Sequence, residues 1–350
     1  MTNGGKYDIF KEKKNTIDGM ENRIMKKILL PENMPYYRAN LHCHSTVSDG
    51  RKTPEELKAF YMSRGYQVIA YTDHEKMVCH NDLTDEHFVA LNGYEAGFNE
   101  SEGDDWTRKK VCHLCLVAMD PDRTAPVAES APRIYSGEAI SDFMQRAAEE
   151  GFYVTYNHPV WSLESYPQYS GYHGMHAMEI VNFACLIEGF DDDNGHCYED
   201  FLRMGQRLFC IATDDNHNAI PDDSPACDSF GGYTMIAAES LDYRAVTDGL
   251  KQGRFYASTG TATHVGPVIK SLVYEDGVVT ITTSEVREIA YIPDSRCCAL
   301  VHAKDGETIN AASFRVKEGN RWFRLVVRDR EGYKAYTNAY FPDDFLETES

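Results

Sequence analysis

The chain has 350 residues, of which 42% are hydrophobic, and a formal net charge of -20. This length is enough for one large catalytic domain with a small module, or for two medium domains. The negative charge opposes binding along a nucleic-acid backbone, so we expect no extended nucleic-acid partner. A small anion held at bound cations is compatible with this charge.

The N-terminal segment is polar and contains no long apolar run. We therefore expect neither a signal peptide nor a membrane span. Ten cysteines without regular spacing indicate reduced thiols and a cytoplasmic location. Residues 1–35 are expected to form an N-terminal arm, with a helix from Thr16 to Leu30 that ends before Pro31 and Pro35.

From Tyr36 onward, predicted helices alternate with short apolar strands. Thr53-Pro54-Glu55-Glu56 has the pattern of a capping box that starts a helix, and Gly65 ends that helix. Further helices are predicted over residues 138–150, 198–204 and 242–252, with strands over 36–41, 68–71, 152–156, 208–212 and 254–258. This alternation predicts an α/β protein with a parallel sheet, which the length of residues 36–264 would allow to close into a barrel-like form.

After about Thr263 the pattern changes. Residues 268–283 alternate between apolar and polar side chains around Glu275-Asp276-Gly277, which is typical of a β-hairpin. Further strand-like runs span residues 288–292, 298–303 and 322–328. We expect residues 265–350 to form a small antiparallel β-sandwich-like domain that serves as a structural lid or as a dimerisation module in a homo-oligomer.

Polar side chains cluster just after the predicted strands. His42 and His44 are two residues apart, so on an extended backbone both imidazoles project from one face. The candidate metal ligands are His42, His44, Asp49, His74, Glu95, His113, His158, Asp215 and His217. Nine nitrogen and oxygen donors are too many for one tetrahedral site, and they suit two or three divalent cations that share carboxylates. Zinc, manganese and iron are the candidate metals.

These motifs resemble those of the PHP (polymerase and histidinol phosphatase) family of metal-dependent hydrolases. The matching segments are His42-Cys43-His44-Ser45, Ser48-Asp49-Gly50, Thr72-Asp73-His74, Gly93-Tyr94-Glu95, His113, Asn157-His158-Pro159 and Asp215-Asn216-His217. Residues 157–161, residues 253–260 and Ala335-Tyr336-Thr337-Asn338 are similar to the CehA/McbA-like branch, which is named for carbamate-hydrolysing enzymes.

The resemblance implies a distorted seven-stranded β/α barrel with a trinuclear metal centre. By analogy, the first metal is held by His42, His44, Glu95 and Asp215, the second by Glu95, His113 and His158, and the third by Asp49, His74 and His217. The catalytic groups would then be the four ligands of the first metal, because they hold the cations that activate a bridging hydroxide.

Other residues are candidates for contacts with a small anionic substrate. Lys76 and Arg254 are candidate anion contacts, Trp161 is a candidate pocket wall, and His173 or His176 is a candidate substrate contact or general acid. The favoured function is a phosphoesterase that cleaves a small soluble phosphate ester. The alternatives are a carbamate or ester hydrolase, as the CehA/McbA resemblance permits, and a non-catalytic, metal-stabilised module whose β-rich tail binds a partner.

Overall fold

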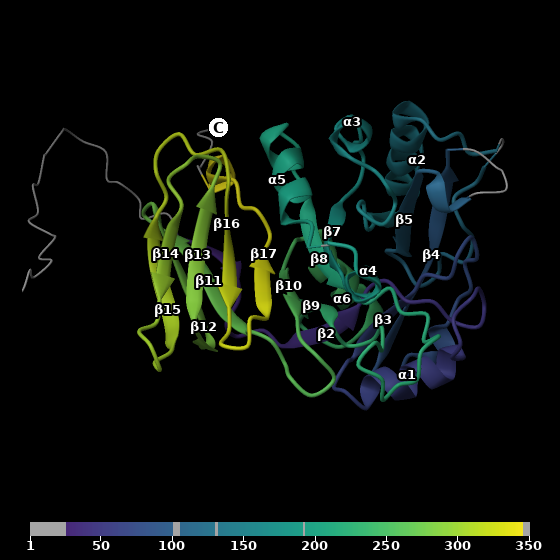
Figure 1. Cartoon of the computed structure of the whole chain (residues 1–350), viewed down its shortest axis with the longest axis horizontal. Coiled ribbons are helices and arrows are strands. Elements are labelled where there is room, and N and C mark those ends of the chain that lie inside the picture. The colour runs from purple at the N-terminus through teal and green to yellow at the C-terminus, as the bar shows by residue number, and fades with distance from the viewer. Residues whose placement is uncertain (1–25, 101–105, 130–131, 192, 346–350) are drawn as a thin grey trace, which may run out of the picture.

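The computed structural model describes residues 26–100, 106–129, 132–191 and 193–345. Most strands in these ranges join one mixed sheet of thirteen strands (Figure 1). In spatial order this large sheet contains β14 (Ala299–His302), β13 (Glu288–Pro293), β16 (Phe323–Arg328), β17 (Lys334–Thr337), β10 (Phe255–Thr259), β9 (Gly232–Ala237), β2 (Tyr36–Asn40), β3 (Val68–Tyr71), β4 (Val89–Asn99), β5 (Val111–Ala118), β6 (Phe152–Tyr156), β7 (Ala177–Asn182) and β8 (Phe209–Thr213).

A second sheet is smaller and antiparallel. It contains β1 (Lys26–Leu30), β11 (Ile269–Glu275), β12 (Val278–Val286) and β15 (Ile309–Arg315), in that order. Buried residues of both sheets, such as Leu30, Leu272, Ile289 and Leu325, belong to one apolar cluster. The small sheet therefore packs against the end of the large sheet that lies on the left of Figure 1.

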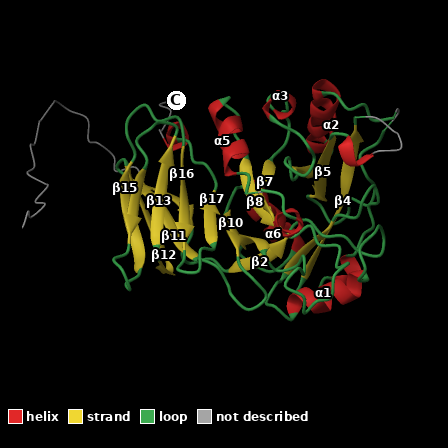
Figure 2. Cartoon of the chain, in the orientation of Figure 1, coloured by secondary structure: helices red, strands yellow, loops and turns green. Residues whose placement is uncertain are grey.

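Helices accompany the part of the large sheet from β2 to β8, whereas the part around β11–β16 consists mainly of strands and loops (Figure 2). The first helix begins as the sequence predicts, because Thr53 and Glu56 form a capping box. The helices are α1 (Pro54–Met62), α2 (Gly137–Glu149), α3 (Tyr166–Tyr169), α4 (Phe183–Glu188), α5 (Gly195–Arg203) and α6 (Tyr243–Lys251), with short 3-10 helices η1 (Asn81–Leu83), η2 (Trp106–Arg108) and η3 (Pro342–Phe345).

The strands that precede the candidate ligands point in one direction. β2, β3 and β4 are parallel to one another, and so are β6, β7 and β8. Between the two groups, β5 runs antiparallel to both β4 and β6. Because β5 is antiparallel to both of its neighbours, β6 runs in the same direction as β4. The carboxyl ends of β2, β3, β6 and β8 therefore lie at the same edge of the sheet.

The large sheet curves until its last strand returns to its middle. In β9, the hydroxyl of Thr234 donates a hydrogen bond of 3.0 Å to the backbone oxygen of Ala212 in β8. These two strands are therefore in contact, although the sheet order separates them. Ala39 of β2, Leu91 of β4 and Ile211 of β8 share one apolar cluster. The curvature brings the ends of distant strands close enough to build a common site.

The predicted α/β class is confirmed by the large sheet and its accompanying helices. The prediction of a parallel sheet is wrong, because β5 and β9 run antiparallel to their neighbours and make the sheet mixed. The helix predicted over Thr16–Leu30 is wrong in its described part, because residues 26–30 form strand β1 and pair with β11. An isolated helix of this length is marginal in water, whereas the strand gains hydrogen bonds and buries Leu29 and Leu30. The rest of that predicted helix lies outside the described residues.

The strands predicted over residues 268–283, 288–292, 298–303 and 322–328 are present, whereas β15 and β17 lie outside the predicted runs. β11 and β12 form the expected hairpin around Glu275-Asp276-Gly277. β17 pairs with β10, so the large sheet continues across residue 264, and the domain boundaries at residues 35 and 264 stay predictions. Among the described helices, none combines the length and the apolar character needed to cross a membrane.

Candidate metal centre

His42 and His44 follow β2, which ends at Asn40. Both side chains are fully buried, and their Nε2 atoms lie 3.0 Å apart. Cys43, between them, belongs to an apolar cluster that also contains Tyr61. The alternation of an extended chain thus directs both imidazoles to one point while the intervening side chain faces the core.

Glu95, in the long strand β4, lies at the centre of the cluster. Its carboxylate is buried and lies close to ring nitrogens of five histidines. The distances are 3.3 Å to His42, 3.5 Å to His44, 2.8 Å to His74, 3.1 Å to His113 and 3.3 Å to His158. Because a carboxylate has two oxygens with free lone pairs, Glu95 is suited to contact two cations at once.

Asp215 approaches the same point from the turn after β8. Its Oδ1 lies 3.1 Å from Nε2 of His42 and 3.0 Å from Nε2 of His44. The residue has a positive φ of 54°, which is strained for a residue other than glycine. The preceding Asp214 stabilises this turn, because its carboxylate accepts hydrogen bonds from the backbone N–H groups of residues 230–232.

Asp49, His74 and His217 form the solvent side of the cluster. The carboxylate oxygens of Asp49 lie 3.6 Å from Nε2 of His217 and 3.7 Å from Nε2 of His74. The imidazole of His44 stacks on that of His217, with 4.2 Å between ring centroids, and joins this group to the buried one. The side chain of Asp49 is 55% exposed, so this part of the cluster is open to a ligand from solution.

The nine predicted ligands come together in four overlapping groups whose donor atoms could hold metal ions. The groups are His42 with His44 and Glu95; His42 with His158 and Asp215; His74 with Glu95 and His113; and His44 with Asp49, His74 and His217. They differ from the sets implied by the resemblance in three residues. His74 lies beside Glu95 and His113 as well as beside Asp49, His158 is grouped with His42 and Asp215, and His44 joins the group of Asp49.

Two features of this cluster fit divalent cations. Donors bound to one tetrahedral ion at about 2.0–2.2 Å lie about 3.3–3.6 Å apart, and most contacts around Glu95 are of this size. In addition, Oδ1 of Asp215 is buried and makes no hydrogen bond in the described structure, although two imidazole nitrogens lie within 3.1 Å. A buried carboxylate oxygen without a partner is costly, and a cation would satisfy it.

Glu179, in the middle of β7, is a positioning residue that the sequence motifs do not identify. Its buried carboxylate accepts hydrogen bonds from Nδ1 of His42 at 2.7 Å, the hydroxyl of Thr213 at 2.6 Å and the backbone N–H of His158 at 3.0 Å. Because an ionised carboxylate only accepts, His42 carries its hydrogen on Nδ1 and keeps a lone pair on Nε2 for a metal. An acidic residue inside an apolar strand is the signal that could have revealed Glu179.

Two more side chains support the ligands from behind. Asn157 donates a hydrogen bond of 2.9 Å to Oε1 of Glu95, which fixes the orientation of that carboxylate. Asp73 accepts from the backbone N–H and the hydroxyl of both Ser45 and Ser48. These bonds fold the loop between the buried histidine pair and the exposed ligands.

The charges of the cluster favour cations. Burial lowers the pKa of His42, but the carboxylates of Asp215 and Glu95 outweigh burial and raise this pKa well above its usual value. In the same way, burial is outweighed at His74 and His158, mainly by Glu95, and their pKa values rise to about 9. Burial raises the pKa of Glu95, yet the surrounding histidines hold it well below its ordinary range. The carboxylates thus stabilise positive charge, which protons or metal ions can supply.

A cavity of about 470 Å³ opens beside the ligands. This volume lies within the range of small-molecule sites. The cavity is also lined by Arg51, Trp161, Cys185 and Glu188. The ring of Trp161 lies 5.0 Å from that of His158, so the structure places the predicted wall residue at the cavity. Arg51 lines the same cavity, and the sequence motifs do not single it out.

The other predicted substrate contacts lie elsewhere. Lys76 is exposed and donates to the backbone oxygen of Val47 at 2.6 Å, outside the residues that line the cavity. Arg254 precedes β10, and His173 and His176 precede β7. Residues that precede these strands lie at the edge opposite the ligands that follow parallel strands, such as His42, His158 and Asp215. The structure therefore does not bring Arg254, His173 or His176 to the cluster.

No family model matches the sequence, and no curated protein matches it. Among solved structures, one match is a two-domain protein from Bacteroides vulgatus ATCC 8482, described as containing a predicted PHP-like metal-dependent phosphoesterase. Its sequence is 14% identical to this chain and the TM-score is 0.45, and the match covers 91% of this chain and 100% of that one.

Two further structures match a smaller share of the chain. A presumed metal-dependent phosphoesterase from Bifidobacterium adolescentis ATCC 15703 is 14% identical with a TM-score of 0.35, and the match covers 53% of this chain and 90% of that one. An amidohydrolase from Chromobacterium violaceum, with bound sulfate and no metal, is 16% identical with a TM-score of 0.35, over 54% of this chain and 93% of that one. The CehA/McbA-like branch stays a prediction.

Proposed function

We propose that this chain is a metal-dependent phosphoesterase that cleaves a small soluble phosphate ester. The observation that carries this proposal is the convergence of nine residues with nitrogen or oxygen donors, Glu95 among them, beside a cavity that Arg51 also lines. The donors suit cations, and the guanidinium suits an anion. A small molecule that carries a negatively charged ester satisfies both.

The nine ligands would hold two or three divalent ions, zinc, manganese or iron, in the sets that the resemblance implies. When bound, such ions make water nucleophilic near neutral pH and neutralise negative charge on the ester. The residues of the chain prepare this chemistry. Glu179 holds one nitrogen of His42 and leaves the other free for a metal, while Asn157 orients Glu95.

Arg51 favours a phosphate ester over an uncharged substrate. A guanidinium is charged at every physiological pH and binds phosphate oxygens in pairs. The backbone N–H of Arg51 donates to the backbone oxygen of His217 at 2.8 Å, so the backbone of Arg51 lies beside the exposed ligands, and Arg51 is among the residues that line the cavity. An ester that reaches those ligands therefore meets a permanent positive charge.

A carbamate or carboxylic-ester hydrolase is the second candidate. Trp161, Ala184 and Ala219 give part of the cavity an apolar lining, which suits an uncharged carbonyl substrate. The same bound cations would polarise a carbonyl group. Arg51 has no evident role in that reaction, and the phosphoesterase is therefore the preferred function.

Turnover by metal-loaded protein separates these functions. The substrates are 4-nitrophenyl phosphate, bis(4-nitrophenyl) phosphate and 1-naphthyl N-methylcarbamate, and we expect the phosphomonoester to react fastest. Arg51→Gln should lower kcat/KM for the phosphomonoester about 10- to 100-fold, the effect of losing charge-assisted hydrogen bonds. Arg244→Gln is the control, because Arg244 is exposed and pairs with Asp120 outside the cavity. Turnover of the carbamate alone would establish the second candidate, and turnover of none would contradict a hydrolase.

We also propose the finer architecture that the resemblance implies: a distorted seven-stranded barrel followed by a β-sandwich-like domain from residue 265, in a cytoplasmic protein. The contact between β8 and β9 supports closure of the large sheet. The apolar cluster shared by the small sheet with β13 and β16 supports the sandwich.

A further inference from the structure

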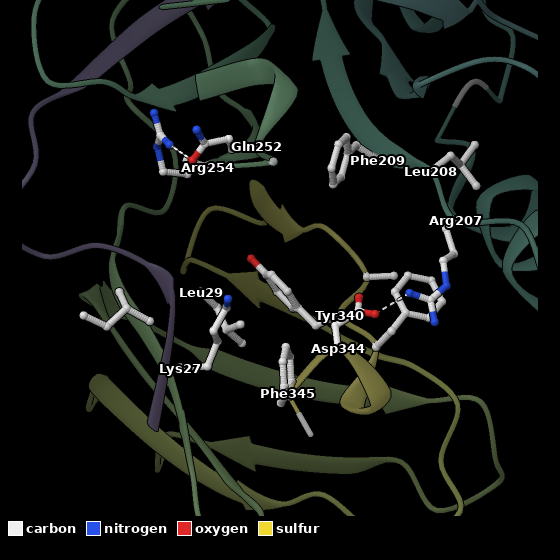
Figure 3. Close-up of a pocket in the computed structure, with 14 residues that line it drawn as sticks. Lys27, Leu29, Arg207, Leu208, Phe209, Gln252, Arg254, Tyr340, Asp344 and Phe345 are labelled. Carbon is white, nitrogen blue, oxygen red and sulfur yellow. Dashed lines mark hydrogen bonds and ion pairs between the residues drawn. The ribbon is translucent and has the colours of Figure 1, made fainter. Parts of the chain in front are cut away.

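A second cavity lies at the edge of the large sheet opposite the metal centre. Its volume is about 410 Å³, which is within the range of small-molecule sites. The residues that precede β8 and β10 form one side, and β1 with the segment after β17 forms the other (Figure 3). Asp215 and His217 follow β8, whereas this cavity lies where β8 begins. The two sites are therefore separate.

The walls of this cavity are largely apolar. Leu208 and Phe209 contribute from the start of β8, and Leu29 contributes from β1. In Figure 3, the ring of Phe209 lies on one side of the cavity, and the rings of Tyr340 and Phe345 lie on the other. Such a lining can enclose the apolar body of a ligand.

The cavity is preformed, because Asn338 joins the segments on its two sides. The side-chain oxygen of Asn338 accepts a hydrogen bond of 2.9 Å from the backbone N–H of Cys210 in β8. Its amide group donates to the backbone oxygens of Gly253 and Phe255 at 3.2 and 3.1 Å. Three buried bonds thus fix the segment after β17 to β8 and to the turn before β10.

The charged residues that line the cavity are mostly cationic. Lys27, Arg207 and Arg254 line it together with one carboxylate, Asp344. Arg207 pairs with Asp344 at 2.5 Å, and Arg254 pairs with Asp248 at 2.9 Å. The ammonium group of Lys27 has no ion-pair partner among the described residues. The cavity therefore keeps one surplus positive charge in a chain whose net charge is -20.

Tyr340 adds a polar group without a partner. Its hydroxyl is buried and makes no hydrogen bond in the part of the chain that the structure describes. In Figure 3 this hydroxyl points toward the side of the cavity where Lys27 and Arg254 lie. Most buried polar groups in folded proteins have a partner, and an acidic group of a ligand would provide one here.

We propose that this cavity binds a small organic monoanion with an apolar body, such as an aromatic or aliphatic carboxylate or sulfonate. The apolar body packs between Phe209 and Leu29, and the acidic group lies beside Lys27 and Tyr340. This site does not depend on hydrolysis at the metal centre, so it is tested by binding alone.

The test uses 1-anilinonaphthalene-8-sulfonate, a monoanion with two aromatic groups whose fluorescence rises in apolar surroundings. The full chain should bind it saturably. Ile28 lines the cavity and is 59% exposed, so its replacement leaves the core intact. Ile28→Asp should weaken binding about threefold and Ile28→Lys should strengthen it about threefold, the effect of one exposed charge pair.

Val265→Asp is the matched control. Val265 is 57% exposed and lies outside the cavity, so this variant adds the same charge and should leave the affinity unchanged. The uncharged sulfonamide of the same dye should bind about tenfold more weakly, because it cannot pair with Lys27. Equal affinity for the sulfonamide would overturn the choice of an anion. Indifference to both Ile28 variants would place the dye elsewhere and overturn the site.

Discussion

Replacing Glu179 by glutamine tests whether the residue behind His42 controls metal binding. One carboxylate oxygen accepts hydrogen bonds from His42 and Thr213, and the other accepts from the backbone N–H of His158 and from the amide of Asn182. Glutamine has nearly the same shape, but one of the two accepting oxygens becomes a donating NH₂ group. One pair of donors must therefore lose its acceptor.

The NH₂ group of the new side chain does least harm beside Thr213, whose hydroxyl can rotate to accept from it. At the other position it would face two fixed donors, from His158 and Asn182. His42 must then accept at Nδ1 and carry its hydrogen on Nε2, the atom that faces Asp215. That atom loses the lone pair that a metal needs. We expect metal affinity to fall about 10- to 100-fold, or about 1.4–2.7 kcal/mol.

Competition with a chromophoric chelator measures the affinity of each variant for Zn²⁺. Glu164→Gln is the matched control, since Glu164 is also buried and accepts hydrogen bonds from the hydroxyls of Tyr135, Tyr156 and Tyr172. These hydroxyls can rotate to accept from the new amide, and none belongs to a candidate ligand. Glu164→Gln should keep the wild-type affinity. Wild-type affinity in folded Glu179→Gln protein would refute the reasoning.

Three further predictions follow from the same geometry. Glu95→Gln should deplete two metal ions together and abolish hydrolysis, because the NH₂ group that replaces one carboxylate oxygen cannot bind a cation. His113→Ala should deplete one ion. Full metal content in Glu95→Gln protein by elemental analysis would remove Glu95 from the centre. In the presence of chelator, thermal stability should fall as the pH rises from about 6.5 to 9. At His74 and His158, Glu95 outweighs burial and raises the pKa to about 9, so the stability that protonation provides below the unfolded pKa is lost as the two histidines deprotonate. A melting temperature that does not change with pH would contradict this. Asn338→Ala should lower the free energy of unfolding by about 3 kcal/mol, because it removes three hydrogen bonds of about 1 kcal/mol each. If urea denaturation finds no loss of stability, the C-terminal strands are not integral to the fold.

The sequence reveals the parts of the site whose chemistry is local. His42 and His44 are recognisable because two histidines on an extended segment share one face, and Asp215 and His217 repeat this spacing after another apolar run. Each of these pairs follows its strand directly, so the edge of the sheet at which it lies follows from the direction of the chain. The alternation of helices and strands predicts the α/β class for the same local reason.

Long-range contacts explain what the sequence does not reveal. Glu179 lies inside a strand, and its partners come from the segments around β2, β6 and β8. Arg254 and His176 are polar residues next to strands, but they precede those strands and therefore lie at the opposite edge. Residues 26–30 form a strand only because β11, some 240 residues later, provides its hydrogen-bonding partner. Pairing of this kind leaves no local pattern.

The metal content of the protein tests the central claim most directly. Protein purified without chelator, and chelated protein reloaded with zinc, manganese or iron, should contain close to three ions per chain by elemental analysis. The family resemblance implies three ions, and the nine donors, Glu95 included, exceed the capacity of one tetrahedral ion. A reproducible content of one ion or less, unchanged by added metal, would contradict a multinuclear centre.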